Sequence, residues 1–161
     1  MNRFTALIIT MMISGMALPA KAYDLTWDLG ASAGSYAGQG YSELNVGLNW
    51  FIEDYLVWRN AVFARFPDSQ DMVTGLDTSM RFQQYGTSDS GTFGAGFFVG
   101  PGIRFSKTDY SAMFLEGGVQ LKLGGLNIGG GAKYFNYMQP GPGLSKNDTV
   151  FFLILSGGGA L

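Results

Sequence analysis

The ionisable side chains that share one face of this chain are the residues best suited to do chemistry. They alternate with apolar residues, and bases and acids nearly balance: Arg59, Arg65, Arg81, Arg104, Lys122 and Lys133 stand against Asp24, Asp28, Glu43, Asp77 and Glu116. An unpaired charge is costly away from water, so charges that are buried together form ion pairs. The pattern predicts an interior network of salt bridges.

Catalytic chemistry has few other candidates in this sequence. There is no histidine and no cysteine, which excludes histidine-based triads, thiol nucleophiles and thiolate zinc sites. Adjacent acids such as Glu53 and Asp54 fit solvated turns, and no run of oxygen ligands is long enough for a calcium loop. We therefore predict no catalytic residue, no cofactor and no metal, and we expect that the protein is not an enzyme.

The composition is unusual for a domain that is surrounded by water. Of 161 residues, 47% are hydrophobic, 25 are glycine and only 14% are charged, where a soluble domain carries about 25% charged residues. The formal net charge of −2 argues against nucleic acid as a partner, because phosphate binding needs a basic patch.

The first 22 residues have the pattern of a secretory signal peptide. Arg3 precedes an uncharged run over residues 4–18, and small residues at Ala20 and Ala22 form a cleavage site. The run is short for a spanning helix, although an uncleaved anchor stays open as the alternative. We expect cleavage after Ala22 and a single domain over residues 23–161.

After Ala22 the apolar residues recur with a period of two, which is typical of β-strands. In the clearest segment, Leu44, Val46 and Leu48 alternate with Glu43 and Asn45. Pro101 suggests a bulge within one strand, and the register of the last strand stays open. Eight strands are predicted, over residues 23–33, 43–52, 55–66, 72–85, 92–105, 110–123, 126–138 and 149–161.

The predicted connections alternate between short and long. Residues 53–54 and 124–125 form tight turns and 86–91 a short link, whereas 35–40, 67–71, 106–109 and 139–148 are the other links. A transmembrane barrel has short periplasmic turns and longer external loops. We therefore expect segments 35–40, 67–71 and 139–148 to be external and to be candidate contact sites.

The apolar face of these strands is predicted to contact lipid. The polar face carries too few charges for a surface in water, and its charges nearly cancel. Glycine concentrates on that face, where it relieves crowding inside a narrow tube. The prediction is an all-β, eight-stranded antiparallel up-and-down transmembrane β-barrel. A secreted soluble barrel that binds an apolar ligand is the alternative fold.

This architecture resembles the small eight-stranded outer-membrane barrels of Gram-negative bacteria, the group that includes the membrane domain of outer membrane protein A. The resemblance covers residues 23–161 and implies a monomer in the cell outer membrane, in contact with its lipid and inserted by the barrel assembly machinery. Such barrels usually end on an aromatic residue, whereas this chain ends on Leu161. Enzymes that resemble lipid A deacylases or omptin proteases depend on histidine, which this chain lacks.

Aromatic residues near the strand ends fit the girdles that mark the two membrane interfaces. Ordinary strand propensity is the alternative explanation. The predicted members are Trp27, Trp50, Trp58, Phe66, Phe93, Phe105, Tyr110 and Tyr134.

Taken together, these features predict a non-enzymatic barrel with a closed polar interior and a structural or surface-presenting role. Eight strands enclose an interior that side chains can fill, which favours a packed core over a pore. The alternative function is a narrow, porin-like channel in which Arg59, Arg65, Arg81 and Arg104 form a path for small anionic solutes.

Overall fold

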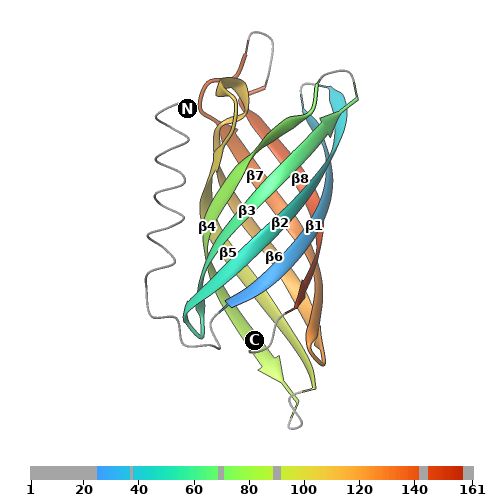
Figure 1. Ribbon diagram of the computed structural model, residues 1–161, viewed down its shortest axis with the longest axis vertical. Coiled ribbons are helices and arrows are strands. Elements are labelled where there is room, and N and C mark those ends of the chain that lie inside the picture. The colour runs from blue at the N-terminus through green and yellow to red at the C-terminus, as the bar shows by residue number, and fades with distance from the viewer. Residues whose placement is uncertain (1–24, 37, 69–70, 89–91, 142–144, 158–161) are drawn as a thin grey trace.

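Eight antiparallel strands close into a barrel in the computed structural model, which describes residues 25–36, 38–68, 71–88, 92–141 and 145–157 (Figure 1). Each strand pairs with its sequence neighbours, and β1 also pairs with β8. This confirms the predicted up-and-down barrel. The strands are β1 (Leu25–Tyr36), β2 (Gln39–Glu53), β3 (Leu56–Pro67), β4 (Val73–Thr87), β5 (Phe93–Phe105), β6 (Ala112–Leu123), β7 (Leu126–Tyr137) and β8 (Asn147–Gly157).

In the described part of the chain, the remaining regular element is a short 3-10 helix, η1 (Thr108–Tyr110), between β5 and β6. Among the described residues, no helix is long and apolar enough to cross a membrane. The predicted signal peptide, Asp24 and the end of the predicted last strand at 158–161 lie outside the described residues.

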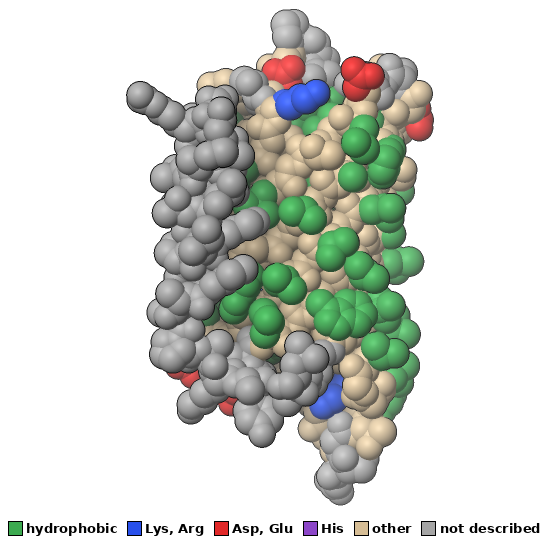
Figure 2. All heavy atoms as spheres, viewed as in Figure 1, with side chains coloured by type: hydrophobic (Ala, Val, Ile, Leu, Met, Phe, Trp, Pro, Cys, Tyr) green, Lys and Arg blue, Asp and Glu red, His purple; other side chains and the backbone are tan. Residues whose placement is uncertain are grey.

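Side chains alternate between the two faces of the wall, because successive residues of a strand point to opposite sides. Leu44, Val46 and Leu48 of β2 are 57%, 53% and 41% exposed, whereas Glu43 and Asn49 are buried in the lumen. Figure 2 shows apolar side chains spread over the visible wall, with charged side chains near its ends. The apolar face points outward, as a transmembrane barrel requires and a soluble barrel cannot tolerate.

Glycine makes room for aromatic rings inside the tube. Phe63 pairs directly with Gly75 on the neighbouring strand, and its ring covers the place where a glycine Cβ would stand. The same arrangement recurs around the barrel, where an inward ring faces a glycine on the next strand, in the pairs Tyr41 with Gly34, Tyr85 with Gly96, Phe98 with Gly118 and Phe114 with Gly102. The glycines of the polar face therefore leave room for the inward-pointing aromatic rings.

Two connections differ from the sequence prediction. Tyr36 pairs with Gln39, so the expected long external link 35–40 is wrong and a tight turn joins β1 to β2. Gly38 permits this turn because its φ is 80°, a conformation that glycine adopts without strain. The predicted link 139–148 is also shorter than expected, because Asn147 and Asp148 already belong to β8.

The predicted bulge at Pro101 is wrong as well. The register is the same on both sides of it, since Ser79 pairs with Gly102 and Phe82 pairs with Val99. Between these pairs β4 and β5 are not paired, because proline has no N–H to donate to the ladder. The strands continue in register across a short unpaired seam.

Seven of the eight predicted girdle aromatics belong to the outward face of their strands, namely Trp27, Trp50, Trp58, Phe66, Phe93, Phe105 and Tyr134. Tyr110 is the exception. It lies in η1 and packs against Tyr36 and Tyr137, with ring centroids 6.0 and 6.5 Å apart, at the mouth of the barrel. The prediction that Tyr110 contacts the membrane interface is therefore wrong, because the chain turns inward there.

Substitution of one ring-facing glycine tests this packing. We expect Gly75→Ala to destabilise the barrel by about 1–3 kcal/mol, as overpacking does in a filled core, because the new methyl group would overlap Phe63 and the Phe105 carbonyl. Gly125→Ala is the matched control, since its methyl group meets nothing within 4 Å. Urea unfolding followed by heat-modifiable gel mobility measures both variants. Equal midpoints for the two would contradict the packing described here.

Candidate functional site

The lumen contains one continuous file of ion pairs. Ten buried charges, five basic and five acidic among the described residues, contact one another in alternation. The N···O distances of successive contacts lie between 2.6 and 4.0 Å. The order along this ion-pair file is Arg59, Asp28, Arg81, Glu116, Lys133, Asp77, Arg104, Glu43, Arg65 and Asp148.

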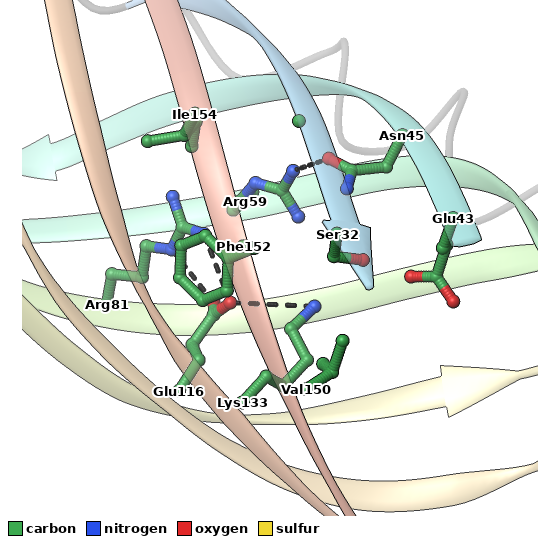
Figure 3. A pocket seen from close by; sticks show the side chains of 11 residues that line it. Ser32, Glu43, Asn45, Arg59, Arg81, Glu116, Lys133, Val150, Phe152 and Ile154 are labelled. Carbon is green, nitrogen blue, oxygen red and sulfur yellow. Dashed lines mark hydrogen bonds and ion pairs between the residues drawn. The ribbon is translucent and has the colours of Figure 1, made fainter. Parts of the chain in front are cut away.

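The ion-pair file connects all eight strands, because each strand contributes at least one of its members. Arg104 of β5 shows how firmly one member is held: its Nη2 donates to Glu43 on β2 at 2.7 Å and its Nε to Asp77 on β4 at 2.7 Å. Figure 3 shows a further stretch, where Arg81 and Lys133 both approach Glu116. These ion pairs hold strands that are distant in sequence in a fixed register relative to one another.

Aromatic rings fill the space between these charges. The guanidinium carbon of Arg104 lies 3.7 Å from the ring centroid of Phe63, and that of Arg65 lies 3.9 Å from the centroid of Tyr41. Lys133 Nζ lies 4.3 Å from the centroid of Phe114. A cation over an aromatic face is stabilised by the ring quadrupole, more strongly where water is absent.

The structure brings together nine of the eleven predicted network residues: Asp28, Glu43, Arg59, Arg65, Asp77, Arg81, Arg104, Glu116 and Lys133. Asp24 lies outside the described residues. Lys122 is half-buried and forms no ion pair with a described residue, so its assignment to the network is corrected. It lies near the turn at the end of β6, beyond the reach of the buried acids.

Sequence reasoning missed Asp148, which it placed in a loop. This carboxylate closes one end of the ion-pair file, where it accepts hydrogen bonds from Tyr41 at 2.5 Å and Tyr137 at 3.3 Å. The sequence does contain a signal for it: Asp148, Val150 and Phe152 are spaced two residues apart, so they lie on the same face of one strand. Treating the polar Asn147 and Asp148 as loop residues concealed it.

The lumen leaves little space for a solute. Two cavities along it measure about 10 and 40 Å³, one lined by Arg59, Arg81 and Glu116 (Figure 3) and the other by Asn49, Gln120 and Asn127. A single water needs roughly 10–15 Å³ by this measure. The described lumen therefore has room for isolated waters, and the geometry does not support the channel alternative.

The lumen also offers no activated nucleophile among the described residues. Ser79 Oγ donates to Glu116 Oε1 at 2.6 Å, but the same carboxylate accepts from Arg81 at 2.8 and 3.1 Å and lies 3.6 Å from Lys133 Nζ. A carboxylate neutralised by two cations is a weak base. No cluster of acids able to hold a metal occurs in the described residues either.

A hollow larger than these two cavities lies on the outside of the barrel. This wall groove has a volume of about 400 Å³ and crosses the unpaired seam between β4 and β5 at Pro101. Apolar side chains dominate it, and Thr78 adds a hydroxyl group. Its lining is Thr78, Ser79, Met80, Pro101, Gly102, Ile103, Met113 and Phe114.

Comparison with known proteins identifies a fold and not a family. No protein-family model matches this chain, and no curated protein matches it. Among solved structures, the barrel is similar to the outer membrane enzyme PagL, with a TM-score of 0.57 and 12% sequence identity over 81% of this chain and 99% of that one. The similarity shows that this chain has the fold of a small outer-membrane barrel.

This comparison corrects the expected function. The prediction of a non-enzymatic barrel with a structural or surface-presenting role is wrong, because PagL has the same fold and is an outer membrane enzyme. The prediction depended on the filled lumen and the missing histidine. A filled lumen leaves the outer wall and the two ends of a barrel available for function.

Removal of one cation tests the ion-pair file. Arg104→Met leaves Glu43 with one basic partner and Asp77 with another, and we expect a loss of about 3–5 kcal/mol, as for other broken buried pairs. Lys122→Met is the control, since Lys122 is half-buried near a turn and forms no ion pair with a described residue; changes away from such contacts stay within about 0.5 kcal/mol. Urea unfolding monitored by tryptophan fluorescence measures the difference. Similar midpoints for the two variants would show that the file adds nothing to stability.

Conductance tests the closed lumen. We expect purified protein in planar bilayers to give no steady openings, because the cavities hold only isolated waters. Reconstitution is checked in the same samples by heat-modifiable gel mobility. Stable anion-selective openings would contradict this description.

Proposed function

We propose that this protein works at the lipid-facing wall of its barrel, where it binds an acyl chain of an outer-membrane lipid in the wall groove. The observation that carries the proposal is the groove of about 400 Å³ at the seam beside Pro101. The groove is continuous with a wall whose outward residues are mainly apolar on every strand. In a membrane, the material that reaches such a groove is hydrocarbon.

The groove has a local cause that favours a specific site over ordinary surface roughness. Large side chains stand out from the wall around Pro101 of β5, with Met113 on β6 at 58% and Phe82 on β4 at 51% exposure. Pro101 also prevents β4 and β5 from pairing at this point. An acyl chain in the groove would cover its apolar lining.

The cellular setting is part of the same proposal. Cleavage after Ala22 in a Gram-negative bacterium would release residues 23–161 for insertion by the barrel assembly machinery. The insertion would place the barrel in outer-membrane lipid, as a monomer whose turns at 54–55 and 124–125 face the periplasm. PagL, an outer membrane enzyme with this fold, is a precedent for a barrel of this size with a function beyond its presence in the membrane.

Photo-crosslinking tests lipid binding at the wall groove. The protein in lipid nanodiscs is irradiated with a phospholipid that carries a diazirine on its acyl chain, and mass spectrometry maps the labelled residues. We expect several-fold more label on Met80, Ile103 and Met113 than on Leu153, although Leu153 is 71% exposed.

Two matched variants identify the groove as the cause. Ile103→Phe narrows the groove and should lower the labelling, because Ile103 lines it. Val99→Phe adds the same ring on the outward face of the same strand, outside the groove lining, and should leave the labelling unchanged. Labelling that simply follows exposure in all three proteins would refute the proposal.

A further inference from the structure

Two polar side chains stand together on the lipid-facing wall beside the wall groove. Asn60 of β3 pairs directly with Thr78 of β4, and both point outward among apolar residues. Thr78 in turn pairs with Ile103, and both of these residues line the groove. Polar side chains that face lipid are costly, and they mark functional positions in membrane proteins.

The Asn60 side chain has no hydrogen-bond partner among the described residues. Its amide can donate through nitrogen and accept through oxygen. Thr78 Oγ1 accepts from Trp58 Nε1 at 2.9 Å, which leaves the Thr78 O–H group able to donate. The Asn60–Thr78 pair thus presents donors and an acceptor to whatever fills the groove.

The depth of this pair excludes a lipid headgroup as its partner. Asn60 lies in the middle third of β3 (Leu56–Pro67), and Thr78 in the middle third of β4 (Val73–Thr87). Headgroups lie beyond the aromatic girdles. Trp58, one of the predicted girdle aromatics, is one outward position nearer than Asn60 to the start of β3, so Asn60 and Thr78 lie on the hydrocarbon side of that girdle. A group that meets Asn60 must therefore be carried along the acyl chain itself.

We infer that the lipid bound in the wall groove carries a hydroxyl group on its acyl chain, and that Asn60 and Thr78 recognise that group. A hydroxyl both donates and accepts, so it satisfies the amide nitrogen or oxygen of Asn60 and the O–H of Thr78. A plain chain satisfies neither, and a ketone or epoxide only accepts. This inference rests on the proposed function, since it names the lipid class for the same groove.

Competition against the diazirine lipid tests the hydroxyl preference. The competitors are a fatty acid with a mid-chain hydroxyl and its unsubstituted parent, each titrated into the purified full mature protein in detergent. We expect the hydroxylated chain to compete up to about tenfold better, which corresponds to one net hydrogen bond of roughly 0.5–1.5 kcal/mol.

Asn60→Leu and Thr78→Val should each reduce this preference while the parent chain still competes. Thr74→Val is the matched control, because Thr74 faces outward on the same strand and does not line the groove. Heat-modifiable gel mobility verifies that each variant is folded. Rescue of the preference by Asn60→Gln would support hydrogen bonding over packing.

The outcomes separate this inference from the proposed function. If both chains compete equally and labelling still maps to Met80 and Met113, the hydroxyl recognition is wrong and lipid binding stands. If neither chain competes, lipid binding in the groove fails and the inference fails with it. If Asn60→Leu instead converts a dimer to a monomer in size-exclusion chromatography with light scattering, a second copy satisfies Asn60 and the inference is overturned.

Discussion

Ten buried charges must be neutralised in place inside a tube that only eight strands enclose. The alternation of acids and bases along the ion-pair file meets this requirement, because every member except the two ends contacts two opposite charges. A slip of one residue in any strand would turn a charge into the hydrocarbon and apolar outward side chains into the lumen. The file therefore specifies register as well as stability.

Glycine and aromatic residues make this file geometrically possible. Five charged side chains with long stems cannot lie across a narrow tube unless the wall recedes somewhere, and the ring-facing glycines provide that space. The rings in turn cover the cations, as Phe63 does for Arg104. Charge pairing, ring packing and glycine placement are thus three aspects of one interior, and the result is a lumen without a path for solutes in its described part.

The sequence predicts the parts of this structure that follow from the alternation of side chains between the two faces of each strand. Alternation along β2 is enough to place Glu43 inside and Leu44 outside, and charge balance among inward residues is enough to predict ion pairs. Alternation between the two faces cannot show where a strand ends. The sequence therefore predicts a loop at Asp148 and a long link at Gly38, where the structure has a strand and a tight turn. Alternation also cannot place Lys122 along the axis of the barrel, where distance from the buried acids excludes it from the file.

The wall groove was beyond prediction for a different reason. Pro101 interrupts one strand, and Asn60 is a polar residue in the apolar face of β3, but they lie on different strands and 41 positions apart in the sequence. Only the pairing of β3 with β4 and of β4 with β5 brings Asn60 next to Thr78 and Thr78 next to Ile103. A lumen rigidly filled by ion pairs can hold such an irregular wall in shape, because the strands beside the seam are anchored from inside through Asp77 and Arg104. The ion pairs of the interior therefore stabilise a barrel whose outer wall is interrupted by a groove.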